Sequence, residues 1–246
     1  SYSNNTCHDN NYDFIIAADG FSSKSSKSKS IKYFKFKYRQ SSLTVKVLIR
    51  NASLKSSFEI LRSEGPFALL PISGDLYQIV WSGLTADCLK RKELSNQLLL
   101  NKLSTILPFG YEPDAIVGNV QVFPNYFCIA FPFFEKRYIL IGEAAHCFHP
   151  VGGQGLNLSW RDVDCLTYMV DRFSRNKRNK LYLPLYYYFK RLPDILLIGF
   201  ITDSIIRIFS NTNLLPLILR RIIFKVLSLS KIIRKYLFKL MTIGIS

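Results

Sequence analysis

The sequence lacks any C-x-x-C pair, although it contains five cysteines. They are scattered along the chain, at Cys7, Cys88, Cys128, Cys147 and Cys165. An odd number of cysteines without regular spacing argues against a disulfide framework. We therefore expect five free thiols and a reducing compartment.

Long apolar runs are also missing. Asp194, Asp203, Arg207 and Arg220 interrupt the apolar C-terminal third, so no segment reaches the roughly 18 residues that a membrane-spanning helix needs. The chain begins at Ser1, and its first residues lack the basic, apolar and small-residue sections of a signal peptide. These absences predict a cytoplasmic chain without a membrane span. Peripheral contact with the inner face of a membrane stays open.

Acidic residues are few: 17 Asp and Glu stand against 33 Lys and Arg, which gives a formal net charge of +16. A positive charge favours anionic partners, namely nucleic acid, acidic lipid or a phosphorylated cofactor, and does not choose among them. The 246 residues are 48% hydrophobic, which is enough for one large domain or two small ones with a packed core. The composition therefore excludes a disordered tail.

Apolar patterning predicts a β-rich first part and a helical end. The run over residues 14–18 predicts a buried strand before a loop. Further β-rich runs over residues 31–84 are separated by turn residues and predict a mostly antiparallel sheet, and strands resume over 115–141. Between them, a period near 3.6 predicts one amphipathic helix from Thr85 to Leu107.

From Leu156 onward the pattern is helical. The first helix should carry one apolar stripe, with polar residues opposite. The predicted stripe is Leu156, Val163, Leu166, Val170 and Phe173, and the predicted opposite face is Arg161, Asp162 and Asp164. After residue 211, Lys and Arg are interleaved with Ile, Leu and Phe, which predicts a pair of basic amphipathic helices.

One segment carries a sharp chemical signature: YILIGEAAHCFHPVGGQGLNLSWRDVDCL, residues 138–166. A strand over 138–141 would end at Gly142 and Glu143, at the edge where open α/β sheets bind ligands. The turn over 150–155 has little side-chain bulk, so a flat ligand can lie against its backbone, and the following helix start attracts negative charge. A reduced flavin carries such charge, and its ribityl hydroxyls suit the Glu143 carboxylate.

This segment resembles the second flavin-binding motif of the FAD-dependent aromatic-ring hydroxylases, most closely the ubiquinone-biosynthesis branch of these flavoprotein monooxygenases. DFIIAADGFSS (13–23) resembles the family's Asp-Gly motif, GPFALLPISGDLYQIVWS (65–82) resembles strands of its substrate domain, and residues from 189 onward resemble its tail. The resemblance implies an α/β (α+β) fold, namely a partial FAD/NAD(P)-binding flavoprotein-hydroxylase fold with a β-rich substrate domain and a helical C-terminus.

The resemblance also implies FAD as cofactor and NAD(P)H as co-substrate. Glu143, after Gly142, takes the place of the carboxylate that holds the ribityl chain, where most relatives have Asp. The residues implied against the isoalloxazine ring are Pro150, Gly152, Gly153, Gln154, Gly155 and Asn157. Asp19 and Gly20 belong to the motif near the phosphates of FAD and the nicotinamide cofactor, although Ala17 and Ser26 depart from its pattern. No side chain is identified as a catalytic base.

Members of that family begin with a G-x-G-x-x-G turn that cradles the FAD pyrophosphate, and this sequence contains none. The simplest interpretation is a fragment without the N-terminal third or more, or half of a split enzyme whose partner chain carries the turn. Residues 1–30 would then be a remnant of the FAD-binding domain, 31–134 the substrate domain, 135–180 a return to the FAD-binding domain, and 181–246 the C-terminal helices. Such a piece should bind FAD poorly by itself.

Three functions remain open. The resemblance implies monooxygenation, in which NAD(P)H supplies electrons and O₂ supplies an oxygen atom to an aromatic, quinone-precursor-like substrate. A second interpretation is a non-catalytic remnant or half of a split flavoenzyme. A third is a basic module that binds a membrane surface or nucleic acid; the lysine-rich run over 24–37 is better interpreted as a solvated loop and edge strand than as a nucleic-acid site.

Glu143, His146, Cys147 and His149 also have the residue types of metal ligands, and Glu-x-x-His is a unit of di-iron bundles. Such a bundle needs a second copy and two further glutamates, whereas His8 is the only other histidine. We therefore expect no metal site and interpret both histidines as hydrogen-bonding residues near the helix start.

Overall fold

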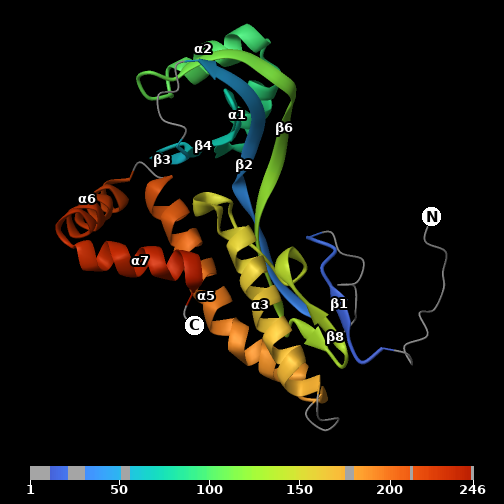
Figure 1. The fold of residues 1–246 in the computed structure, drawn as a ribbon. Coiled ribbons are helices and arrows are strands. Elements are labelled where there is room, and N and C mark those ends of the chain that lie inside the picture. Colours follow the sequence, from blue (N-terminus) through green and yellow to red (C-terminus); the bar gives the residue numbers. More distant parts are fainter. Residues whose placement is uncertain (1–11, 22–30, 51–55, 175–179, 211–212, 245–246) are drawn as a thin grey trace.

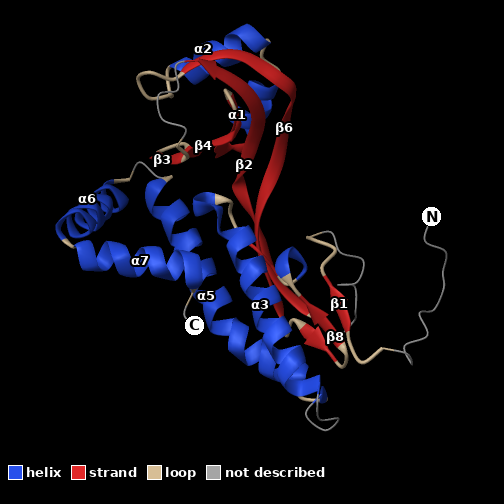
Figure 2. Ribbon diagram, in the orientation of Figure 1, coloured by secondary structure: helices blue, strands red, loops and turns tan. Residues whose placement is uncertain are grey.

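A computed structural model describes residues 12–21, 31–50, 56–174, 180–210 and 213–244. It has the expected mixed α/β architecture, with a curled antiparallel sheet, a small second sheet and a helical C-terminal part (Figures 1 and 2). The expectations for Cys7, His8 and Ser26 fall outside the described residues.

The small sheet contains the predicted parallel strand. β1 (Ile15–Ala17) pairs in parallel with β8 (Tyr138–Leu140), and β7 (Phe134–Glu135) pairs with the other side of β8. The Ile141 N–H donates a hydrogen bond of 3.1 Å to the carbonyl oxygen of Ala17. The chain therefore leaves the carboxyl ends of β1 and β8 side by side.

The large sheet is antiparallel, as expected, with the strand order β3-β4-β5-β2-β6-β9. Its strands are β2 (Lys32–Arg50), β3 (Phe58–Arg62), β4 (Gly65–Ser73), β5 (Leu76–Leu84), β6 (Glu112–Phe131) and β9 (His146–Cys147). β2 and β6 are 19 and 20 residues long and extend through the lower and upper parts of the molecule (Figure 1). Side chains alternate along a strand, so a sheet has two faces. In the upper part of the large sheet, one face packs against helices and the other is directed toward the rest of the chain.

Two helices cover the first face, α1 (Thr85–Lys92) and α2 (Asn96–Ser104). The prediction of one helix over residues 85–107 is wrong, because Ser95 interrupts it and caps α2 by accepting the Leu98 N–H at 3.4 Å. The buried core beneath these helices contains Leu43, Val45, Val47, Phe67, Leu69, Ile79, Trp81, Cys88, Leu99 and Leu103.

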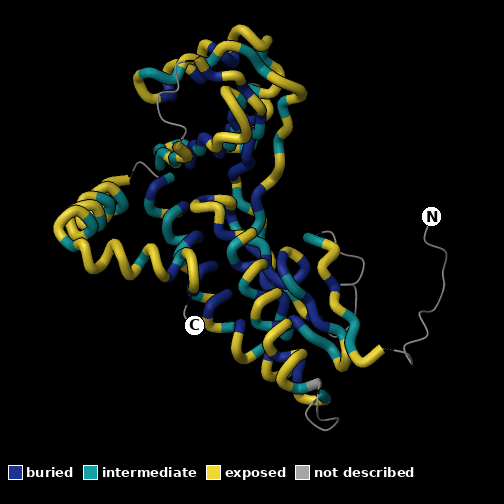
Figure 3. The backbone as a smooth tube through the Cα atoms, viewed as in Figure 1, coloured by how far each residue is buried: buried dark blue, intermediate teal, exposed yellow. Residues whose placement is uncertain are grey.

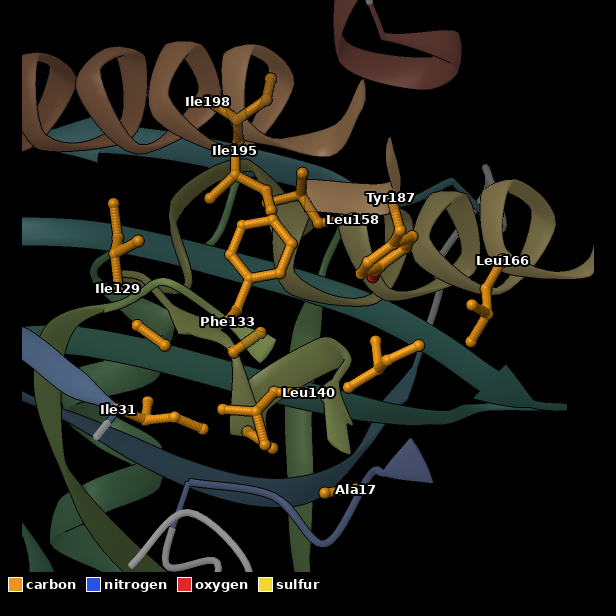
Figure 4. Close-up of a cluster of buried hydrophobic side chains, with 14 of the residues drawn as sticks. Ala17, Ile31, Ile129, Phe133, Leu140, Leu158, Leu166, Tyr187, Ile195 and Ile198 are labelled. Atoms are coloured by element: carbon orange, nitrogen blue, oxygen red, sulfur yellow. The ribbon is translucent and has the colours of Figure 1, made fainter. Parts of the chain in front are cut away.

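A second core joins the small sheet to α3 (Gln154–Ser174) and α5 (Leu183–Phe209). The two helices lie side by side along the lower part of the molecule (Figure 1). Side chains from both helices and from β8 meet in this core (Figure 4), among them Phe133, Leu140, Leu158, Leu166, Tyr187 and Ile195.

The buried face of α3 differs from the predicted stripe. Its buried residues are Gln154 at the first position and Leu158, Asp162, Leu166 and Met169 along the helix. The prediction is wrong for Leu156, Val163 and Val170, which are exposed, and for Asp162, which was assigned to the polar face and is fully buried. The helix takes this orientation because Asp162 belongs to a buried ion-pair network described below.

The chain ends in the expected pair of basic helices, α6 (Leu214–Leu229) and α7 (Lys231–Ile243). They form an arm beside α5 (Figure 1), and most of their surface is exposed (Figure 3). Within the described ranges, every helix is too short or too polar to cross a membrane.

Candidate functional site

The two sequence motifs meet at one edge of the small sheet. Asp19 and Gly20 follow β1, while Gly142 and Glu143 follow β8, so both pairs lie where parallel strands end. Glu143 lies in the single-turn helix η3 (Gly142–Ala144), and its side chain is exposed, as is that of Asp19. Two carboxylates, those of Asp19 and Glu143, therefore lie at the edge where sheets of this type bind ligands. We call this the acidic edge of the small sheet.

Gly142 is held in place by α3. Its φ of +58° favours glycine, and a Cβ there would lie 3.0 Å from Ser159 Oγ. Its N–H donates to Asp162 Oδ2 at 2.9 Å. The turn after β8 is thus hydrogen-bonded to Asp162 of α3 and leaves no room for a side chain next to Ser159 of the same helix.

Asp162 is the centre of a buried network. Its Oδ2 lies 2.7 Å from His146 Nε2, and its Oδ1 accepts from Arg191 Nε at 2.7 Å. Arg191 also donates to Asp194 Oδ2 at 2.7 Å, and Asp194 Oδ1 accepts from Arg161 at 2.8 Å. Burial raises the pKa of Asp162, but His146 and Arg191 outweigh burial, so this pKa lies below its usual value. The network links the turn after β8 to α3 and α5.

The glycine-rich loop, residues 150–155, is open on one side; we call it the glycine loop. It contains the single-turn helix η4 (Val151–Gly153), in which Gly152 and Gly153 have φ values of +70° and +59°. Side chains are disfavoured at such angles. Among the described residues, apart from the chain neighbours and the backbone of the same helix, no heavy atom lies within 4 Å of a Cβ placed on Gly153 or Gly155. A flat ligand could therefore approach the backbone at these two positions.

His149 anchors the start of this loop. Its Nδ1 accepts the Val151 N–H at 3.3 Å, and its Nε2 lies 3.1 Å from Gln40 Oε1 and 2.9 Å from Asn125 Nδ2. Burial lowers the pKa of His149 to about 4, so the ring is neutral near pH 7 and can accept the loop N–H. With the His146 bond to Asp162, the interpretation of both histidines as hydrogen-bonding residues is confirmed. In the described part of the chain, no three His, Cys, Asp or Glu residues are arranged to hold a metal ion.

Gln154 and Asn157 behave differently. The buried Gln154 donates from Nε2 to Gly152 O at 2.8 Å, while its Oε1 has no hydrogen-bond partner among the described residues. A buried acceptor without a partner is costly, and it would suit an N–H or O–H group of a ligand. Asn157 Nδ2 instead lies 3.5 Å from Met241 O, so this side chain points toward α7.

The loop amides are partly occupied by the protein itself. The Gly152 N–H donates to Glu59 Oε2 at 2.9 Å, and the Gly153 N–H donates to Pro150 O at 3.0 Å. Glu59 is not among the residues predicted from the sequence, whereas these amides were expected to contact a flavin. The first amides of a helix generally lack intrahelical acceptors, and η4 leads directly into the first turn of α3.

A pocket of about 480 Å³ is bounded by the open face of β3, β4 and β5 on one side and by residues 150–153 on the other. Another of about 1320 Å³ lies between α3 and α5 and contains no residue of the glycine loop. We consider the smaller pocket the relevant one, because it adjoins the loop and has an apolar floor made by Pro66, Ala68, Leu70 and Val80.

The described cysteines are free thiols, as expected: Cys88, Cys128, Cys147 and Cys165. Burial raises the pKa of all four, and for Cys147, next to the acidic edge, burial together with the charge of Glu143 raises it to about 12. None of the four is therefore a thiolate near neutral pH.

Comparison with known protein families and sequences shows which proteins this chain is similar to. The model of the FAD binding domain family matches residues 8–183. The chain is 30% identical over 190 residues to the ubiquinone biosynthesis monooxygenase COQ6, mitochondrial, of Caenorhabditis elegans, covering 62% of this chain and 42% of that protein. It is 29% identical over 222 residues to the ubiquinone hydroxylase UbiL of Rhodospirillum rubrum, covering 84% of this chain and 48% of that protein. The chain thus spans about half the length of the curated relatives it matches.

Among solved structures, p-nitrophenol 4-monooxygenase PnpA from Pseudomonas putida DLL-E4 superimposes with a TM-score of 0.72 over 94% of this chain and 59% of that chain. At 15% identity this likeness shows the fold alone. The family match extends from before β1 to the start of α5 and includes the acidic edge and the glycine loop. The chain therefore belongs to the FAD binding domain family of FAD-dependent monooxygenases, with ubiquinone-biosynthesis hydroxylases among its homologues.

Proposed function

We propose that this chain forms the isoalloxazine and substrate side of an enzyme that uses FAD, NAD(P)H and O₂ to hydroxylate an aromatic quinone precursor. The observation that carries the proposal is the position of the glycine loop, between the acidic edge of the small sheet and an apolar pocket on the large sheet. The names of the ubiquinone-biosynthesis homologues support the substrate class.

The side chains and backbone of this site fit the isoalloxazine and ribityl parts of FAD. Bound FAD would supply the electron transfer and the activation of O₂. Glu143 would accept hydrogen bonds from ribityl hydroxyls, Gln154 Oε1 would accept a ring N–H, and the α3 N-terminus would stabilise negative charge on the ring. At Gly153 and Gly155 the backbone carries no side chain that would stand between it and the ring. Asp19 and Gly20 are proposed to lie near the cofactor phosphates.

The sequence contains no G-x-G-x-x-G turn for the FAD pyrophosphate. We propose that a further polypeptide segment, in this protein or in a separate chain, supplies it. Two features support this: β1 pairs only with β8 among the described strands, and α3 exposes a row of apolar side chains, Leu156, Trp160, Val163 and Val170. Monomeric proteins rarely leave such a row uncovered.

The test is FAD binding by the 246-residue chain, with and without a co-expressed dinucleotide-binding segment taken from the UbiL homologue. We expect weak binding alone and stoichiometric yellow complex, reducible by NADH or NADPH, with the segment. Tight binding by the chain alone would overturn the need for a second segment. No binding in either case would overturn the flavoenzyme proposal and favour a non-catalytic remnant.

The arm formed by α6 and α7 favours a second function. We propose that this arm binds peripherally to the anionic surface at the inner face of a membrane. Leu215, Leu229 and Ile232 are 78%, 76% and 82% exposed, and the sequence contains no Asp or Glu after Asp203. The cationic residues of the arm are Arg220, Arg221, Lys225, Lys231, Arg234, Lys235 and Lys239. Each Lys or Arg near an anionic bilayer contributes about 1 kcal/mol, and the apolar side chains can enter the interface.

Flotation with phosphatidylglycerol-containing vesicles and with pure phosphatidylcholine vesicles tests this docking. We expect binding to the anionic vesicles only, weakened by salt and by serine substitution of Leu215, Leu229 and Ile232. The matched control is Phe109→Ser, which removes a fully exposed apolar side chain outside the arm. Equal loss of flotation in the control, or flotation unaffected by the three substitutions, would refute membrane docking by these helices.

A further inference from the structure

The pocket beside the glycine loop has an ordered floor. On β4 and β5, Phe67, Leu69, Ile79 and Trp81 face the core under α1 and α2. The alternate residues of the same strands must face the other way. They are Pro66, Ala68 and Leu70 on β4 with Val80 and Ser82 on β5, and all of them line the pocket.

Glu59 stands in this same row. It is the register partner of Ala68, and Ala68 is the partner of Val80, so the three side chains lie next to one another across β3, β4 and β5. Of the described residues that line the pocket, Glu59 is the only one with a charged side chain. Its position places one carboxylate at the margin of a mostly apolar floor in which Ser82 is the other polar residue.

The carboxylate is fixed at one oxygen. Oε2 accepts the Gly152 N–H at 2.9 Å, and among the described residues this is the single hydrogen bond to Glu59. A carboxylate can accept about four hydrogen bonds, so Oε1 retains acceptor capacity. Glu59 keeps an exposed surface, which leaves it accessible from the open pocket. Crowding by protein atoms nevertheless raises its pKa, against the smaller lowering effect of the Gly152 N–H.

We propose that Glu59 is a specificity-determining residue that accepts a hydrogen bond from the ring hydroxyl of the aromatic substrate. This inference rests on the proposed function, which supplies the flavin that would react with the substrate. The substrate class itself is inferred from the geometry of the pocket. An uncharged phenol satisfies the free carboxylate oxygen with its O–H and covers the apolar floor with its ring. A phenolate or a benzoate would instead bring a second negative charge next to the Glu59 carboxylate, and the two like charges would repel each other. The site therefore takes neutral phenols and rejects aromatic acids.

The experiment uses 4-nitrophenol as probe, because its phenolate absorbs visible light and its ionisation can be followed directly. The 246-residue chain is compared with Glu59→Gln and with Glu93→Gln, an exposed glutamate at the end of α1. In the wild-type chain and in Glu93→Gln, binding should raise the pKa of the probe. In Glu59→Gln the rise should be smaller by about one pH unit or more, because the ratio of phenolate affinity to phenol affinity should increase roughly tenfold over that of the wild type.

A second measurement needs no variant. 4-Nitroanisole has the same ring but no O–H, so it should bind the wild-type chain about tenfold more weakly than 4-nitrophenol at a pH where the phenol is protonated. Equal probe pKa values in wild type and Glu59→Gln, equal affinities for the two compounds, or no binding of 4-nitrophenol to the wild type would each overturn the assignment. Equal pKa values would leave Glu59 as a structural contact of Gly152.

The failure of this inference can be distinguished from failure of the proposed function. FAD binding is measured separately, with the complementing segment and without the probe. If the chain binds no FAD but shows the Glu59-dependent shift in the probe pKa, the phenol site is supported and the flavoenzyme proposal is wrong. If the chain binds FAD but shows no such shift, the flavoenzyme proposal is supported and the role of Glu59 is wrong.

Discussion

The negative charge of the Asp162 carboxylate is stabilised by hydrogen-bond donors on several sides. It accepts the Gly142 N–H and binds Arg191 and His146, with no exposed surface of its own. Its removal would leave the buried Arg191 without one of its two anionic partners and the turn after β8 without its acceptor. Breaking a buried pair by removing one partner is costly because the other charge stays buried.

We expect Asp162→Ala to lower the free energy of unfolding by roughly 3–5 kcal/mol, and Asp162→Asn to lower it by less, since the amide can keep part of the hydrogen bonding. Urea unfolding followed by circular dichroism measures both changes. The matched control is Asp164→Asn, two residues further along α3 and exposed, which should change stability by less than about 0.5 kcal/mol. Similar losses at the two positions would contradict the importance of the network.

His149 makes stability depend on pH. Its pKa is about 4 in the folded chain against an ordinary value of 6.5, so the unfolded chain binds a proton first as the pH falls. Stability should therefore decrease as the pH is lowered from 6.5 to 4, by roughly 3 kcal/mol from this group. The depressed pKa of Asp162 adds a further loss only below its unfolded value of 3.8.

Urea midpoints at pH 7, 6, 5 and 4 give this slope. His149→Gln should unfold more easily at pH 7, because the Val151 N–H loses its acceptor, yet lose much less stability between pH 6.5 and 4 than the wild type. A variant whose stability follows the wild-type pH dependence would show that another group titrates in this range.

At the residue scale, the sequence predicted what depends on local chemistry. Gly142 and Gly152 were recognisable because a turn of little bulk after a strand favours glycine, and both have positive φ. Glu59 was not recognisable, because its role depends on β3 pairing with β4 opposite a loop 93 residues away. Asp162 had a signal that was missed: it lies four residues from both Leu158 and Leu166, and these two residues define the buried face of α3.

At the scale of elements, α3 has two apolar faces, and this explains the error in the predicted stripe. One face carries Leu158 and Leu166 into the core, while the other exposes Leu156, Trp160 and Val163. Periodicity alone cannot decide which face packs inward when both are apolar. The predicted helix over 85–107 failed for another reason, since its pattern continues across the Ser95 cap that divides it.

The exposed face of α3 gives an optical test of the proposed second segment. The chain has two tryptophans, Trp160 at 60% exposure and Trp81 at 3%. If a dinucleotide-binding segment covers this face, its addition should shift the fluorescence of Trp160 to shorter wavelength. Trp160→Phe should remove the shift and leave the emission of buried Trp81 unchanged. A shift that persists in Trp160→Phe would place the contact elsewhere.

At the scale of the whole molecule, charge and hydropathy predicted the basic C-terminal arm but not where it ends. Met241 at the end of α7 lies close to the glycine loop: a Cβ placed on Gly152 would be 3.3 Å from its Cε. Asn157 contacts the backbone of Met241 as well. These contacts join the first turn of α3 to residues more than 80 positions later, so only the folded chain reveals that the proposed membrane arm and the proposed flavin loop touch.

This contact predicts that the arm stabilises the loop. Removal of residues after Asn211 should raise amide hydrogen exchange over 150–157, because the loop loses its packing against Met241 and the free energy of local opening falls. Ile232→Ser, which alters an exposed side chain of the same arm, should leave that exchange unchanged while weakening vesicle binding. Exchange that is equal in the truncated and complete chains would mean that the arm and the loop are energetically independent, and truncation would then report on membrane docking alone.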